Sequence, residues 1–513
     1  MMKYRIYNII AALLLVLATS CESDFLNQQI GTELLEDQTW VSYTYTQQFL
    51  GGIYSYLPGG FNDVDGAMLE SATDDAEETW ESSDVQLFNN GSWGPYVNPD
   101  DQWKRMFEGI RKVNLLLENI YQVNLEKYRL DIQATAQTEY QFRLIEVERW
   151  KYEARFLRAY FYFELIKRYG GVPIITETLS IDENLSKIQR NTLDECVSFI
   201  AGELDLAGRH LKLYPGRTST DNSALGRATK GAAYALKSRV LLYAASPLYL
   251  DPENISSSAT SNATKWQAAA EAAKMVIDSC GSTYQLVSDY ANFFNKNTSK
   301  DIIFQKQFAA NNDFEVANYP VGYAKGKSGT TPTQNLIDAY EMISGKLITD
   351  PSSGYDPQSP YTNRDGRLAK TVLLNNSSWN GRNVQSWLGG LDGVDQDRGT
   401  KTGYYLKKHV VQNVDIYNDK TAAHTWPLIR LAEVYLNYAE ALNEYNPGNN
   451  AIITYLNMIR ARAGMPAISA LSQDEMRKLI RRERRIELAF EGHRFWDVRR
   501  WKEGTTYFNV SST

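Results

Sequence analysis

Residues 483–501 read ERRIELAFEGHRFWDVRRW, and this charged, aromatic stretch decides the fold. Its carboxylates Glu483, Glu487 and Glu491 recur every four residues, so a helix would stack them along one face. Gly492 should end that helix and let the aromatic side chains after it pack back against it. We expect three nearby arginines to pair with these carboxylates and with neighbouring helix ends: Arg484, Arg485 and Arg494.

The same stretch offers a competing interpretation, a basic patch for nucleic acid. Its candidate residues are Arg481, Arg482, Arg499 and Arg500. Acidic residues interleave with them, and the chain carries 54 Lys+Arg against 61 Asp+Glu, a formal net charge of −7. A nucleic-acid binder normally carries a basic excess. We therefore expect a structural, salt-bridged helix and no nucleic-acid partner.

Helical periodicity continues outward from the C-terminus. Apolar residues at helical spacing predict helices within five segments: 101–121, 154–169, 225–247, 266–277 and 426–466. Small residues and Tyr on the contact faces are typical of paired helices that resemble tetratricopeptide repeats. Between about 281 and 425 this signal fades into Gly-, Asn- and Asp-rich sequence. We predict a mainly α, tetratricopeptide-repeat-like scaffold with a loop-rich insertion that carries short strands.

The first twenty residues have the pattern of a targeting segment. Lys3 and Arg5 precede an apolar run from Ile9 to Ala18, which is too short to span a bilayer comfortably. Small residues then lead directly to Cys21, an arrangement that resembles a bacterial lipoprotein signal. We predict a signal peptide at 1–20 and lipidation of Cys21, which would anchor the protein to a membrane surface. The alternative is a plain secretory signal with an incidental cysteine.

Several segments carry a family resemblance in addition to ERRIELAFEGHRFWDVRRW. They are ARFLRAYFYFELIKRYGGVP (154–173), GAAYALKSRVLLYAASP (231–247), NRDGRL (363–368), IRLAEVYLNYAEALN (429–443) and MIRARAGMP (458–466). Together with the lipoprotein start, they resemble the SusD/RagB family of outer-membrane nutrient-binding lipoproteins of Bacteroidetes. The resemblance implies one SusD-like domain over 21–513, with an N-terminal helical half (21–280), an insertion (281–425) and C-terminal helices (426–513).

The resemblance also implies a function. A protein of this family would face outward from the outer membrane, held by its lipid anchor, and bind an oligosaccharide. It would then deliver this ligand to a SusC-like TonB-dependent transporter, without catalysis. Two alternatives stay open: a peptide ligand, as in the RagB branch, and, as a weaker possibility, a secreted glycoside hydrolase.

The segment Ser71–Asn98 is the best candidate for a ligand surface, because it lacks apolar periodicity and is rich in aromatic, acidic and amide side chains. Saccharides need rings for their C–H faces and polar groups for their hydroxyls. We predict ligand contacts near residues 71–98 from Trp80, Trp93, Tyr96, Asp74, Asp75 and Asn89. From the mid-chain loops we predict contacts from Tyr319, Tyr323, Trp379 and Trp387. For any single aromatic residue, packing in the core is the competing role.

No motif predicts chemistry at this surface. Four His and three scattered Cys lack the spacing of a zinc site, and no nucleophile or phosphate-binding motif is present. The acidic loop with Asp392, Asp395 and Asp397 lacks the spacing of a calcium-binding EF-hand, so we expect a solvated loop. We accordingly predict no catalytic residue, no metal and no cofactor.

Overall fold

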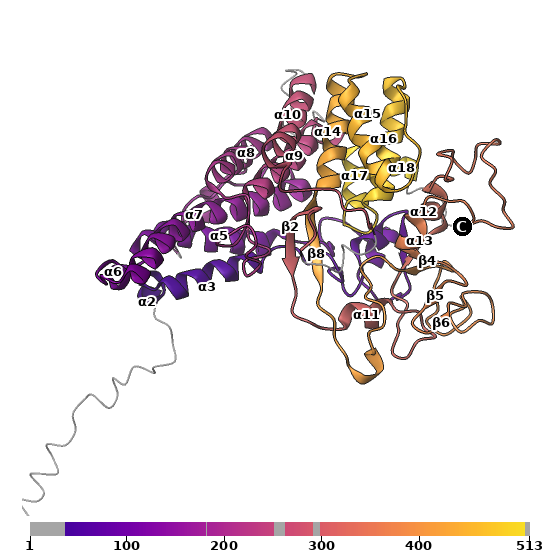
Figure 1. Cartoon of the computed structure of the whole chain (residues 1–513), viewed down its shortest axis with the longest axis horizontal. Coiled ribbons are helices and arrows are strands. Elements are labelled where there is room, and N and C mark those ends of the chain that lie inside the picture. Colours follow the sequence, from indigo (N-terminus) through magenta and orange to yellow (C-terminus); the bar gives the residue numbers. More distant parts are fainter. Residues whose placement is uncertain (1–35, 181, 251–261, 291–297, 508–513) are drawn as a thin grey trace, which may run out of the picture.

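Figure 1 shows the protein as a computed structural model, which describes residues 36–180, 182–250, 262–290 and 298–507. The principal helices are α2 (Glu36–Val41), α3 (Tyr43–Tyr54), α5 (Trp103–Asn119), α7 (Ala134–Tyr169), α8 (Leu193–His210), α9 (Lys230–Ala245), α10 (Asn262–Cys280), α14 (Leu431–Tyr445), α15 (Asn450–Arg462), α16 (Gln473–Glu487) and α17 (Arg494–Arg500). Short helices are α4 (Gln86–Asn89), α6 (Glu126–Arg129), α11 (Asp313–Asn318), α12 (Gln334–Ala339), α13 (Leu368–Thr371) and α18 (Gly504–Tyr507). The predicted signal peptide and Cys21 lie outside the described residues.

The long helices form a continuous array (Figure 1). Each packs on the next, in the order α5, α7, α8, α9, α10, α14, with α15 and α16 both against α14. Small residues permit this close packing: a Cβ on Gly208 of α8 would lie 2.2 Å from the Tyr234 ring of α9. One continuous apolar core runs through the array, as expected when paired helices bury their faces by stacking. The prediction of a mainly α, tetratricopeptide-repeat-like scaffold is confirmed.

The insertion is built from loops and short antiparallel strand pairs. The strands are β1 (Ala76–Glu78), β2 (Ile302–Gln307), β3 (Thr330–Pro332), β4 (Val372–Leu373), β5 (Ser378–Trp379), β6 (Arg382–Asn383), β7 (Tyr405–Leu406) and β8 (Thr425–Arg430). They pair as β1–β3, β2–β8, β4–β7 and β5–β6. The β1–β3 pair joins the 71–98 segment to the insertion, so two parts of the chain that are distant in sequence meet at the predicted ligand surface.

Two local predictions at the C-terminus were wrong. WPLIR (426–430), expected within a helix, is part of β8, because its backbone pairs with β2. Helix α16 ends at Glu487, before Gly492, so Glu491 lies outside the helix that was expected to carry it. The left-handed backbone of Phe490, with φ at 59°, redirects the chain there. Glu491 nevertheless reaches the same polar network as Glu483 and Glu487.

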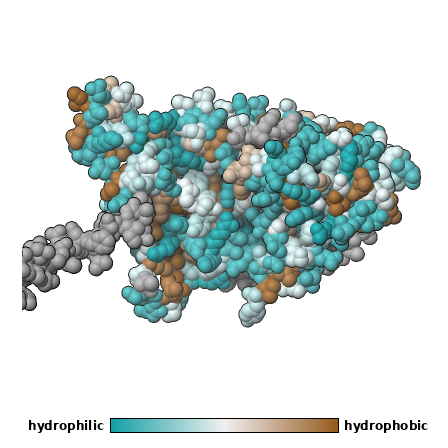
Figure 2. Space-filling view, turned by 90° about the horizontal axis from the view of Figure 1, so that it is seen from below, coloured by the Kyte–Doolittle hydropathy of each residue, from teal (hydrophilic) through white to brown (hydrophobic). Residues whose placement is uncertain are grey.

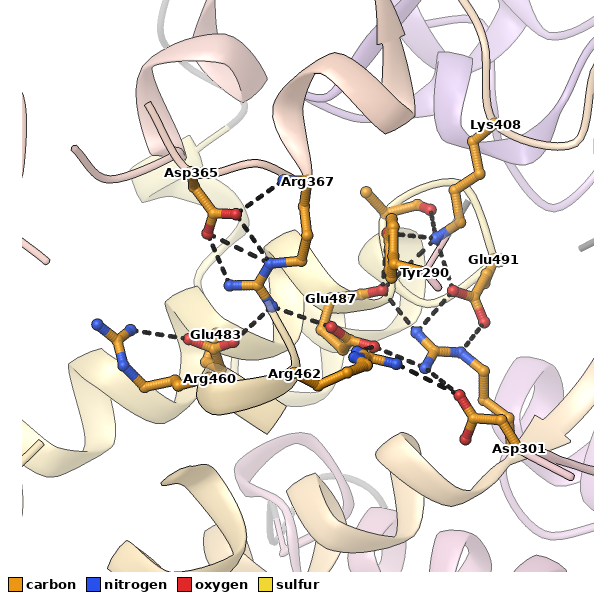
Figure 3. Close-up of polar contacts among 12 residues, drawn as sticks. Tyr290, Asp301, Asp365, Arg367, Lys408, Arg460, Arg462, Glu483, Glu487 and Glu491 are labelled. Atoms are coloured by element: carbon orange, nitrogen blue, oxygen red, sulfur yellow. Dashed lines mark hydrogen bonds and ion pairs between the residues drawn. The ribbon is translucent and has the colours of Figure 1, made fainter. Parts of the chain in front are cut away.

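That network is a buried cluster of ions between the insertion and the C-terminal helices (Figure 3). Arg367 lies 2.5 Å from Glu483 and 2.9 Å from Glu487, and all three side chains are almost fully buried. Arg430 lies 2.7 Å from Glu487 and 2.6 Å from Glu491. Burial alone would raise the pKa of Glu487, but the guanidinium groups of Arg462, Arg430 and Arg367 lower it well below its usual range.

The carboxylates on this face therefore do not pair with the arginines we expected. Their partners are more distant in sequence, Arg367, Arg430, Arg460, Arg462 and Lys408. The signature arginines bind elsewhere: Arg484 contacts Asp497 at 2.7 Å, whereas Arg485 and Arg494 contact Asp74. Sequence spacing identified the charged face correctly but could not identify long-range partners.

A second buried ion cluster fixes the end of the signature to α14. Arg500 binds Glu440 through two contacts of 2.6 and 2.7 Å, and Trp501 donates its indole N–H to the same carboxylate at 2.7 Å. Burial opposes ionisation of Glu440, but Arg500 lowers its pKa to about 2. The aromatic and basic residues that follow Gly492 therefore hold helices together. In the described part of the chain, no helix is long and apolar enough to cross a membrane.

The buried cluster gives a direct stability prediction. Substitution Glu487→Gln should lower the free energy of unfolding by about 3–5 kcal/mol, because it removes a buried negative charge that Arg367 and Arg430 share and leaves the cluster with excess positive charge. Urea unfolding followed by tryptophan fluorescence measures the change. Asp278→Asn is the matched control, since it breaks an exposed ion pair with Lys274 on α10 and should leave the midpoint nearly unchanged. Equal midpoints for Glu487→Gln and Asp278→Asn would contradict the structural role of the cluster.

Candidate functional site

An open groove lies where the 71–98 segment meets the insertion. It has a volume of about 420 Å³ and is lined by Glu77, Glu78, Glu81, Gln86 and Lys401. The lining side chains already form a hydrogen-bond network: Gln86 donates from Nε2 to Glu77 at 3.1 Å and to the Glu78 carbonyl at 3.0 Å. Lys401 approaches Glu81 at 3.3 Å across the groove lining. The groove is thus polar and pre-formed, which suits a hydroxyl-rich ligand.

Trp80 lies in the turn between Glu78 and Glu81, beside this groove. Its indole N–H donates to the Lys327 carbonyl at 2.9 Å, which fixes the ring to the insertion. The side chain is half-buried. A ring that is held by its polar edge and partly exposed can offer its surface for stacking. The role of Trp80 as a stacking platform stays a prediction, and its partly exposed ring is compatible with it.

Trp93, Tyr96 and Asn89 lie further along the same segment. Trp93 is 44% exposed and Tyr96 is 99% exposed, so neither belongs to the core. The Trp93 ring packs at 5.0 Å from Phe88, and its indole N–H donates to Asn98 at 3.1 Å. Asn89 is exposed and lies within 3.4 Å of the Gln86 side chain that lines the groove. Asn89 therefore links the groove to the loop that carries Trp93.

Asp74 and Asp75, also predicted ligand contacts, lie in a different environment. Asp74 accepts hydrogen bonds from Arg494 and Arg485, at 2.8 Å each, and Asp75 accepts one from Arg485 at 2.7 Å. Burial alone would raise the pKa of Asp74, but Arg485 and Arg494 lower it below its usual value. Both carboxylates bind arginines of the C-terminal helices and so join this segment to α16 and α17. We therefore do not include them in the candidate site.

The four mid-chain aromatics divide between core and surface. Tyr319 and Trp379 are each only 2% exposed and pack edge to face at 6.0 Å, which is a core arrangement. Tyr323 is half-buried and donates its hydroxyl to the Trp379 carbonyl at 2.8 Å. Trp387 is 48% exposed on a loop. Of the four, Trp387 and, in part, Tyr323 keep surface exposed to solvent.

Asp392 organises the loops behind these rings, which corrects our expectation of a solvated loop at this one position. Asp395 and Asp397 are exposed, as expected. The Asp392 carboxylate is buried and binds both terminal nitrogens of Arg382, at 2.6 and 2.8 Å. The backbone N–H groups of Gln385 and Gly322 also donate to it, at 2.9 and 3.2 Å. Arg382 in turn covers the Tyr323 ring at 3.9 Å. Among the described residues, no group of three or more His, Cys, Asp or Glu side chains could hold a metal ion.

Sequence reasoning missed the basic side chains around the aromatic rings. They are Lys327 and Arg398 beside Trp80, Arg382 beside Tyr323, Arg499 beside Trp93, and Lys401 in the groove. The only available signal was a basic residue next to glycine in a loop, as in GKS and DRGT. That pattern is too common to mark a site without the fold. Figure 2, seen from below Figure 1, shows a mostly hydrophilic face whose apolar patches are small and separate.

The position of Asp74 gives a second prediction. Asp74→Asn should lower the free energy of unfolding by about 2–3 kcal/mol, because it weakens charge-assisted hydrogen bonds with two buried arginines. Tyr96→Ala, on the exposed loop, should unfold at the midpoint of the unmodified protein. Thermal and urea unfolding compare the two variants. If Asp74→Asn kept its stability but lost ligand binding, Asp74 would be a ligand contact and not a structural residue.

Comparisons with known proteins agree with this architecture. A model described as SusD family matches residues 284–513, and one described as starch-binding associating with outer membrane matches residues 24–242. SusD-like protein P25 of Formosa agariphila is 25% identical over 97% of this chain and 90% of its own length.

Solved structures share the fold. A SusD-like protein from Bacteroides fragilis superposes with a TM-score of 0.76 at 29% identity, covering 92% of this chain and 89% of its own. A laminarin-binding SusD-like protein superposes with a TM-score of 0.64 at 22% identity, covering 91% of this chain and 92% of its own. The two family models span most of the sequence, and the signature residues 483–501 form the C-terminal framework of the fold. The chain belongs to the SusD/RagB family.

Proposed function

We propose that this protein captures an oligosaccharide on the surface formed by the groove, Trp80, Trp93 and Trp387. The observation that carries the proposal is a polar groove whose lining residues Glu78 and Glu81 lie on either side of Trp80 in the chain. The ring of Trp80 is half-buried, and the ring of Trp93, on the same 71–98 segment, is 44% exposed. Exposed rings suit the apolar faces of sugars, and the amide and carboxylate groups of the groove suit their hydroxyls. The laminarin-binding structural neighbour supports the same ligand class.

The proposed activity is binding without chemistry. Glycoside hydrolysis requires two carboxyl groups flanking a bond, about 5–10 Å apart, with one raised in pKa to act as the acid. Asp74 and Asp75 are occupied by Arg485 and Arg494. Glu78, whose pKa burial raises to about 7, is bonded to Thr330 and to the Trp80 backbone. These carboxyl groups therefore serve the structure of the loops.

The bound oligosaccharide would pass to a SusC-like TonB-dependent transporter in the outer membrane. In this proposal the protein faces outward and is held by lipid on Cys21. The family description, starch-binding associating with outer membrane, supports the location. The lipoprotein-like sequence before Cys21 supports the anchor. Such an anchor leaves the loops of the insertion free to meet ligands outside the cell.

Ligand capture can be tested with ring deletions. Trp80→Ala and Trp93→Ala should each weaken binding to the recognised oligosaccharide by at least tenfold, because each removes a stacking surface. Affinity gels against a glycan panel followed by isothermal titration give the measurement. Tyr121→Ala is the matched control, since Tyr121 is 76% exposed but lies on the α5 side of the helical array.

Three results would redirect this proposal. Full binding by both tryptophan variants would move the site away from the groove. Binding of peptides and of no glycan would favour a RagB-like role. New reducing ends after incubation with a glycan would indicate a hydrolase.

The anchor can be tested separately in cells. Cys21→Ala should move the protein from the outer-membrane fraction to a soluble fraction, because no acyl chain can be attached at the start of the mature chain. Fractionation and labelling with a palmitate analogue measure the shift, with Cys196→Ala as the control because Cys196 is buried in the fold. A membrane-bound Cys21→Ala variant would contradict lipid anchoring at this residue. Co-purification of a SusC-like transporter with the unmodified protein would test the partner.

A further inference from the structure

Two cations from different loops converge on Trp80. The Lys327 ammonium lies 5.7 Å from the ring centroid, and the Arg398 guanidinium lies 5.1 Å from it. Both side chains are exposed. Lys401, in the adjoining groove, is also half exposed. A ligand that approaches the Trp80 ring would therefore meet positive charge there.

The charges of Lys327 and Arg398 are poorly neutralised. Over the ranges that the structure describes, Lys327 has no carboxylate within 4.0 Å. Arg398 has only Asp397, at 3.8 Å, and the side chains of Arg398 and Asp397 are 61% and 95% exposed. Such a pair contributes little in water. Arg382, by contrast, is fully engaged with buried Asp392. The two cations beside Trp80 therefore remain available to a ligand.

The backbone holds one of these two cations in an unfavourable conformation. Arg398 has φ at 61°, and Ser328, the residue after Lys327, has φ at 55°. A left-handed conformation costs a non-glycine residue about 1–3 kcal/mol and persists where surrounding contacts impose it. Glycine or asparagine would fit position 398 with less strain.

The lining of the groove carries less negative charge than its three glutamates suggest. Burial raises the pKa of Glu78 to about 7, and burial also raises the pKa of Glu77. Glu78 therefore carries less negative charge near neutral pH than a free carboxylate. Glu81 is 86% exposed and faces Lys401 at 3.3 Å. The Trp80 end of the groove is accordingly not closed to anions.

We propose that the Trp80 end of the groove selects acidic saccharides, with Lys327 and Arg398 binding an anionic group on a sugar that stacks on the ring. The anionic group is a carboxylate or a sulfate ester, since both accept hydrogen bonds from ammonium and guanidinium groups. This inference rests on the proposed glycan capture and specifies its ligand class. Lys401 supplies a third positive charge along the groove.

The test uses paired probes that differ only in charge. Oligogalacturonate is compared with its methyl ester, and a sulfated galactan oligosaccharide with its desulfated form, by isothermal titration at low and high salt. At least one acidic probe should bind at least tenfold more tightly than its neutral twin, with an advantage that falls as salt rises. Lys327→Gln and Arg398→Gln should each reduce this advantage by about fivefold or more. Lys104→Gln, an exposed cation on α5, is the matched control and should change nothing.

The outcomes separate the inference from the function on which it rests. A preference for only the carboxylate or only the sulfate probe supports the inference and identifies the anionic group. Equal binding of acidic and neutral twins, unaffected by Lys327→Gln and Arg398→Gln, overturns acidic selectivity but leaves glycan capture intact. Absence of binding to any glycan of the panel or of these pairs overturns both.

Discussion

The fold depends on burying opposite charges between the insertion and the C-terminal helices. Arg367 and Arg430 leave water completely, at a desolvation penalty of several kcal/mol per ion, and only close, multiple contacts with Glu483, Glu487 and Glu491 offset it. These contacts form only when segments far apart in sequence are in register. The cluster therefore makes a loop-rich insertion, with little regular structure of its own, inseparable from the helical array.

This requirement explains why the family signature, residues 483–501, determines the architecture and carries little information about the ligand. In residues 483–501, the acidic side chains hold the insertion, and Arg485 and Arg494 hold the 71–98 segment through Asp74. Arg500 and Trp501 hold α14 through Glu440. Side chains that form buried ion pairs cannot be replaced to suit a different ligand without loss of stability. Specificity is left to the loops that this framework positions.

Sequence periodicity predicted what depends on local order and missed what depends on long-range contact. Apolar spacing predicted α5, α9, α10, α14, α15 and the second half of α7, but not α8. Trp93 and Trp387 are exposed on loops, whereas Trp80 is half-buried. WPLIR became a strand because it pairs with β2, a partner more than a hundred residues away. Asp74 was assigned to a ligand because its arginines lie some four hundred residues later in the chain. Neither the β2–β8 pairing nor the contacts of Asp74 with its arginines can be predicted from the adjacent residues.

The framework also determines how the binding loops behave. Asp392 fixes Arg382 and two backbone N–H groups, and the Tyr405 hydroxyl donates to its carbonyl at 2.8 Å. Trp80 is tied to the Lys327 carbonyl, so the loops that carry these two residues are tied to each other. Loops that are ordered before a ligand arrives lose little conformational entropy on binding. The contacts around Arg398 then hold its backbone in the strained conformation. Ligand contacts at this surface would not have to offset the cost of ordering the loops.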